Sequence, residues 1–147
     1  MTSTGSDQRS NDRGSAAIEA AVLAPPLLAL IALAIVGGRL QVAGGAIEAA
    51  AHDAARAASI SRTAADAQTN AHNAASATLT QQGLHCASLT VTVNTTGFAV
   101  PVGQPATVSA SVTCVVDLSD LVADGVPGTR TITSTFVSAL DSFRARS

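Results

Sequence analysis

Aromatic side chains are almost absent from this sequence. Phe, Trp and Tyr together make up 2% of the 147 residues, and neither Trp nor Tyr occurs. Proteins that bind single-stranded nucleic acids commonly stack the bases on aromatic rings, and this chain has almost none to offer bases or sugars. Any hydrophobic core must therefore be built from Ala, Val, Leu and Ile.

Charged residues are also few. They account for 12% of the chain, and the formal net charge at pH 7 is −2. A nucleic-acid-binding domain needs a basic surface to neutralise phosphates, and the sequence has no such surplus of basic residues. We therefore expect no nucleic-acid partner.

Motifs for catalysis and cofactor binding are lacking as well. The sequence contains no phosphate-binding loop, zinc motif or dinucleotide fingerprint. His52, Asp53, Ser59 and Ser61 are residue types of a hydrolase site, but all four fall on one expected helix, without the strained turn that exposes a nucleophile. We expect a solvated helix face there, no enzyme activity, no cofactor and no small-molecule substrate.

Cysteine occurs only twice, at Cys86 and Cys114. An even pair in a small domain favours one disulfide, which would close a loop of about 28 residues and stabilise the fold by about 3–4 kcal/mol. Such a bond would place this region outside the cytoplasm. The alternative is a pair of buried free thiols. Together with His85 the two cysteines supply too few ligands for a zinc site, so we expect no metal.

What the sequence does contain is a long apolar segment near its N-terminus. Residues 20–37 form a run of 18 residues without a charge or strong polar group. As a helix this run measures about 27 Å, which is just enough to cross a bilayer. We assign residues 15–38 to a transmembrane helix. Residues 1–14 are polar, have little to bury, and are expected to form a disordered cytoplasmic leader.

Two features of the apolar segment need an explanation. Glu19 lies in its first turns, where a carboxylate costs on the order of 2.5 kcal/mol at the bilayer centre and less near the end. It either lies at the interface, near headgroups and the positive end of its own helix, or is kept for a cationic partner. Pro25 and Pro26 remove backbone hydrogen bonds, either as a kink that serves subunit packing or extraction, or as a tolerated irregularity.

The segment resembles TadE-type pseudopilins, which are membrane-anchored minor pilin-like proteins of tight-adherence (Flp) pilus assembly systems. The resemblance rests on Arg13-Gly14-Ser15-Ala16-Ala17-Ile18-Glu19, on Pro25, and on Ala54-Ala55-Arg56-Ala57. Gly followed by four small or apolar residues and Glu is also similar to the processing site of type IV prepilins, although those usually carry aromatic residues where this chain has Ser15 and Ala20. Cleavage between Gly14 and Ser15 would leave an ammonium at Ser15 that neutralises Glu19 of an axially shifted neighbour.

The resemblance implies a bacterial single-pass membrane protein of a tight-adherence pilus or related secretion apparatus. Its N-terminus would be cytoplasmic and its C-terminal domain extracytoplasmic. The implied partners are the membrane, other pilin-like subunits, the pilus assembly platform and a prepilin peptidase. The alternative is an uncleaved single-pass protein whose outer domain binds an envelope partner or ligand. Arginines flank the apolar segment on both sides, so their count does not decide the orientation.

The remainder of the chain predicts an α+β fold of pilin-like type. Residues 39–82 are expected to form a long Ala-rich helix, and residues 83–147 a small three-stranded antiparallel sheet with strands near 89–93, 108–116 and 132–137. A seam of small residues recurs along the helix and is expected to cover the sheet, the alternative being a coiled coil. The seam consists of Ala43, Ala50, Ala57, Ala64 and Ala71, with Ile47, Ala54 and Ser61 between them.

The alternation of the first two strands also constrains the cysteines. If odd-numbered Leu89 and Val93 share a face with even-numbered residues 108–116, Cys86 falls outside the alternation of its own strand. A bond to Cys114 then requires Cys86 to lie before the strand or at a bulge.

Overall fold

The structure is a computed structural model that describes residues 8–121 and 127–141. Its elements in chain order are α1 (Gln8–Ser59), α2 (Ala64–Gln81), β1 (Ser88–Asn94), the 3-10 helix η1 (Thr96–Ala99), β2 (Thr107–Asp117), α3 (Leu118–Leu121) and β3 (Thr129–Ala139). The chain divides into two compact units, Met1–Gly38 and Arg39–Ser147. The fold class is α+β, as predicted.

The first unit consists of the N-terminal part of α1. Its large apolar side chains are exposed, for example Leu23 at 65% and Leu33 at 68%. Among the described residues, one helical segment, Ala17–Ser59, is long and apolar enough to cross a membrane. Residues 8–14, expected to be disordered, instead belong to α1. Extending an existing helix avoids the cost of a new nucleus, which accounts for the longer helix. Residues 1–7 of the expected leader lie outside the described part.

The second unit contains the predicted three-stranded sheet. The strand order is β1-β2-β3, and both pairings are antiparallel. In β2 every even-numbered residue from Val108 to Val116 is buried, while the odd-numbered residues are partly or fully exposed. One face of the sheet therefore belongs to the core, and the other carries Thr and Ser toward solvent.

The expected single helix over residues 39–82 is two helices. α1 ends at Ser59 and α2 begins at Ala64, so the prediction of one continuous helix is wrong. Thr63 is the N-cap of α2: its hydroxyl accepts from the backbone N–H of Asp66 at 3.1 Å and donates to the Asp66 carboxylate at 2.8 Å. Capping by Thr with an acidic residue three positions later favours a new helix start over continuation.

The break also changes the predicted seam. In α1 and α2 the buried side chains follow the three- and four-residue spacing of each separate helix. They are Ala43, Ala46, Ile47, Ala50, Ala51, Ala54, Ala55 and Ala58 in α1, and Ala67, Ala71, Ala75 and Leu79 in α2. Ala57, still within α1, is only half-buried, and Ala64, the first residue of α2, is exposed, so the predicted seven-residue repeat does not describe the buried face of either helix.

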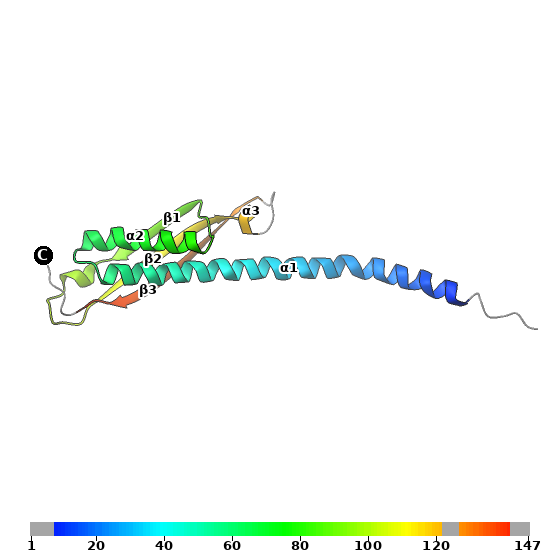
Figure 1. The fold of residues 1–147 in the computed structure, drawn as a ribbon, viewed down its shortest axis with the longest axis horizontal. Coiled ribbons are helices and arrows are strands. Elements are labelled where there is room, and N and C mark those ends of the chain that lie inside the picture. The colour runs from blue at the N-terminus through cyan, green and yellow to red at the C-terminus, as the bar shows by residue number, and fades with distance from the viewer. Residues whose placement is uncertain (1–7, 122–126, 142–147) are drawn as a thin grey trace, which may run out of the picture. The chain divides into compact units, whose positions relative to one another are not determined.

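Both helical segments of the second unit contribute to one core with the sheet. The buried residues of α1 and α2 form a single cluster with Val91 and Val93 of β1 and with the even-numbered residues of β2. Figure 1 shows α2 beside β1 and the C-terminal part of α1 alongside the sheet. The small-residue side of the helices thus covers the protein's own sheet, as expected.

Candidate functional site

The predicted processing site and Glu19 lie on α1. The backbone of Gly14 and Ser15 is helical. Glu19 is exposed, and no ion pair involving it occurs within residues 8–121 and 127–141. Its carboxylate is therefore open to a cation from outside the chain. Pairing with another subunit and cleavage after Gly14 both stay predictions.

Pro25 and Pro26 lie inside α1 without interrupting it. A proline has no backbone N–H, so the carbonyls four residues earlier, those of Ala21 and Val22, lack their intrahelical donors. Free carbonyls in an apolar segment are costly unless a neighbouring group donates to them. The pair of prolines is consistent with either role considered above, a packing device or a tolerated irregularity.

The two cysteines form a disulfide. Cys86 and Cys114 are bonded, their Cα atoms are 5.4 Å apart, and 28 positions separate them in the chain. Cys86 lies before β1, and the next residue, Ala87, donates its N–H to the carbonyl of Val115 at 2.8 Å. Of the two positions predicted for Cys86, before the strand or at a bulge, the structure shows the first, since β1 begins at Ser88. The bond ties the α2–β1 connection to the middle strand of the sheet.

One side chain of α2 forms hydrogen bonds with the outer edge of β1, the edge that does not pair with β2. The amide of Gln68 donates to the carbonyl of Val91 at 2.7 Å, and its oxygen accepts from the N–H of Val93 at 3.1 Å. One carboxamide thus satisfies a donor and an acceptor that an added strand would otherwise bind. Sequence reasoning missed this contact, because nothing near Gln68 in the chain marks it.

The direction of backbone groups in β3 follows from these bonds. Odd-numbered residues of β1 direct their backbone N–H and C=O groups to the edge where Gln68 lies, and even-numbered residues direct theirs to β2. In β2 the odd-numbered residues therefore bond to β1 and the even-numbered residues to β3. Even-numbered residues of β3 pair with these and direct their backbone groups to β2, in agreement with the bond from Leu140 N to the Ala106 carbonyl at 2.9 Å. The odd-numbered residues of β3, from Thr129 to Ala139, therefore direct their backbone groups to the free edge.

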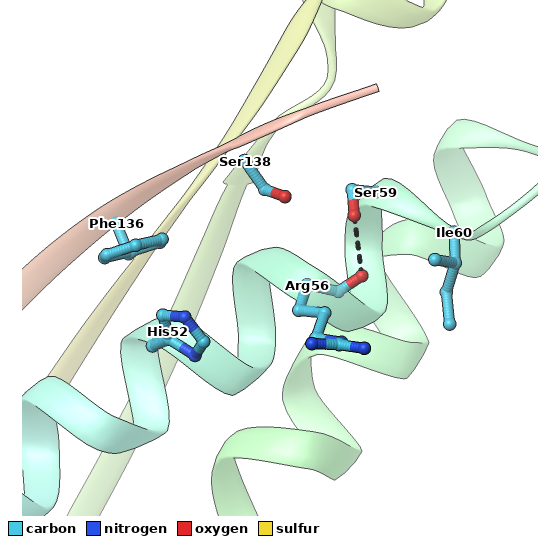
Figure 2. Close-up of a pocket in the computed structure, with 6 residues that line it drawn as sticks. All are labelled: His52, Arg56, Ser59, Ile60, Phe136 and Ser138. Carbon is cyan, nitrogen blue, oxygen red and sulfur yellow. Dashed lines mark hydrogen bonds between the residues drawn. The ribbon is translucent and has the colours of Figure 1, made fainter. Parts of the chain in front are cut away.

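An open hollow lies between α1 and β3. It has a volume of about 320 Å³ and is lined by His52, Arg56, Ser59, Ile60, Phe136 and Ser138. The rings of His52 and Phe136 meet edge to face with centroids 4.5 Å apart, as Figure 2 shows. The aromatic contact fixes the β3 side of the hollow against α1.

The hydroxyls and carboxylate near His52 are engaged in structural contacts. Ser59 Oγ donates to the Arg56 carbonyl at 2.8 Å, drawn as the dashed line in Figure 2, and Ser61 Oγ donates to the Ala57 carbonyl at 2.8 Å. These bonds satisfy carbonyls at the end of α1. Asp53 lies 3.5 Å from His52 Nδ1 and also accepts from Thr78 of α2 at 2.7 Å. The arrangement therefore closes a helix end and joins two helices.

The outer face of the sheet is a polar surface of Thr and Ser. Thr113 and Thr133 share a hydrogen bond of 3.0 Å across β2 and β3, and Thr135 donates to Ser111 at 3.0 Å. The hydroxyls thus bond to one another across neighbouring strands, which stabilises the pairing of β3 with β2.

Residues 14–56 match the model of the family described as TadE-like protein. This segment is TadE-like. No curated protein and no solved structure matches the chain. The resemblance deduced from the sequence is confirmed over these residues.

The TadE-like segment contains the predicted processing residues Gly14 and Ser15, Glu19, both prolines, and Arg56 at its last position. The disulfide, α2 and the sheet lie outside it. The site residues predicted from the sequence are therefore of two kinds, those of the TadE-like segment and the two cysteines of the β-rich region.

Proposed function

We propose that this protein is a membrane-anchored pseudopilin-like subunit that takes part in assembling a tight-adherence pilus or a related secretion apparatus. The observation that carries the proposal is the TadE-like match, which begins at Gly14 and covers the apolar segment. An exposed apolar helix followed by a small α+β unit agrees with this role.

In this proposal the apolar part of α1 crosses the membrane with the N-terminus in the cytoplasm. The disulfide between Cys86 and Cys114 supports an extracytoplasmic position for the second unit, because disulfides persist in oxidising compartments. Protease added to intact spheroplasts is expected to digest the second unit. Protection of that unit until the membrane is permeabilised would contradict the orientation.

Glu19 provides the contact between subunits. After cleavage at Gly14, the new ammonium of one subunit meets the carboxylate of the next, so that neither charge remains unpaired in the lipid. The partners are other pilin-like subunits and the assembly platform, and the protease is a prepilin peptidase. The pairing requires an axial shift between neighbours, which the helical anchor permits.

The experiment that tests processing is an intact-mass measurement of the protein extracted from membranes of its own host. Loss of residues 1–14 is expected, and a Gly14→Ile variant is expected to keep them because the bulky side chain blocks the cleavage site. A matched Gly5→Ile variant should be processed normally. If the unchanged chain keeps its first residues, the protein is an uncleaved single-pass protein with an outer binding domain.

The experiment that tests the pilus role is deletion of the gene followed by complementation. Pilus assembly is expected to fail in the deletion strain and to return with the unchanged gene, but not with the Gly14→Ile variant. Normal piliation in the deletion strain would contradict the proposed role.

A further inference from the structure

We propose that the free edge of β3 binds an extended strand of a partner polypeptide, and that this strand carries a carboxylate that meets Arg56 in the neighbouring hollow. The inference stands independently of the pilus role.

The outer edge of β1 is partly occupied by a side chain, whereas the outer edge of β3 is open. Gln68 occupies the outward donor of Val93 and the outward acceptor of Val91. On β3 the corresponding groups belong to the odd-numbered residues, and within the described ranges no hydrogen bond to their outward N–H and C=O groups is found. A row of free backbone donors and acceptors is what an added strand binds.

The sequence of β3 does nothing to block such an addition. Edge strands are usually protected by short length, lysine, proline or a bulge. β3 has 11 residues, is rich in Thr, and carries a single charge, Arg130, near its start. Phe136 and Val137, on opposite faces of the strand, remain 39% and 56% exposed. An added strand would cover both.

The hollow beside β3 indicates the charge of the partner. Its lining includes Arg56 and His52 but no acidic side chain. Arg56 is exposed and takes part in no ion pair with any residue that the structure describes. On a strand added to β3, the residue opposite Ser138 projects toward this hollow, since paired residues share a face. A carboxylate at that position would meet the guanidinium of Arg56.

A second copy of the same chain fits this edge poorly. β3 itself, with the sequence TRTITSTFVSA, contains no Asp or Glu. A second β3 paired with this edge, in either direction, could therefore place no carboxylate opposite Ser138. The partner is therefore a different polypeptide.

The test uses the full-length protein in detergent and a fluorescent peptide of about nine residues, which lies within the usual range of strand lengths. In the peptide, Thr alternates with apolar residues and one Glu, placed to lie opposite Ser138. We expect saturable binding by anisotropy and slower amide exchange at Thr133 and Thr135. The peptide with Lys in place of Glu, and a peptide N-methylated on the amides that face β3, should each bind roughly tenfold or more weakly.

Variants of the protein separate the two parts of the proposal. Val137→Pro removes an outward N–H and should weaken binding, whereas Val137→Thr keeps it and should bind normally; a preserved melting temperature confirms folding. Arg56→Glu should reverse the preference so that the Lys peptide binds more tightly. Equal binding of the N-methylated peptide, or no binding at all, would overturn the strand addition. An unchanged Glu preference in Arg56→Glu would overturn the role of Arg56.

Discussion

Cys114 faces Leu89, and not its disulfide partner, across the β1–β2 ladder. The bond to Cys86 therefore does not join two paired strand positions. It reaches back from β2 to the connection between α2 and β1 and ties that connection to the sheet. The disulfide consequently restrains the way the chain enters the sheet.

Loss of this bond should destabilise the second unit strongly. Cys86→Ser is expected to cost about 3–4 kcal/mol through the larger freedom of the unfolded chain. For a domain of this size the melting temperature should fall by roughly 12 °C or more. Thermal unfolding with and without dithiothreitol measures the effect. The reductant should lower the melting temperature of the unchanged protein to that of the variant, and a variant as stable as the oxidised protein would contradict the prediction.

Gln68→Ala should open the edge of β1. Loss of the two bonds to Val91 and Val93 is expected to cost about 1–3 kcal/mol, because buried backbone groups lose their partners. Hydrogen exchange of the Val93 amide should accelerate in the variant, and chemical unfolding should show the lower stability. Asn73→Ala on the exposed side of α2 is the control and should change neither quantity appreciably. Unchanged exchange at Val93 would show that Gln68 does not protect the edge.

Gly97→Ala should destabilise the protein, and Gly45→Ala should not. A Cβ at Gly97 would collide with the backbone carbonyl of Thr107 and with Leu140, whereas a Cβ at Gly45 meets nothing within 4 Å. We expect a loss of about 1–3 kcal/mol at residue 97 from overpacking. At residue 45, inside a helix, we expect a gain of about 0.5–1 kcal/mol. Chemical unfolding measures the free energy of unfolding of both variants. Equal values for the two would contradict the close packing at Gly97.

Glu19→Ala should leave membrane insertion intact but weaken co-purification with other pilin-like subunits. The change removes a charge that is costly in an apolar helix and abolishes the proposed pairing with an ammonium on a neighbouring subunit. The measurement is the recovery of partner subunits after affinity purification of the tagged variant in detergent. Glu48→Ala, also an exposed glutamate on α1, is the matched control and should keep normal recovery. Undiminished recovery with Glu19→Ala would count against the pairing role.

Most of the fold could be predicted because its signals are local. The apolar run marks the long N-terminal helix, alternating Val and Thr mark the strands, and the odd-numbered position of Leu89 already indicated that Cys86 lies before the first strand or at a bulge. The break between α1 and α2 was missed although Thr63 and Asp66 form a readable capping pattern. The Ala content of the surrounding residues concealed it, since Ala favours helix everywhere and marks no boundary.

By itself the sequence determined the apolar helix, the TadE-like segment and the three strands, and it favoured a bond between the two cysteines over free thiols, since each of these depends on neighbouring residues or on a single possible pair. Only the tertiary structure decided that α2 folds back beside β1, that Gln68 closes one sheet edge, and that β3 is left open next to Arg56. These features join residues such as Gln68 and Val91, which lie 23 positions apart. Local periodicity carries no information about which distant backbone group a side chain will reach.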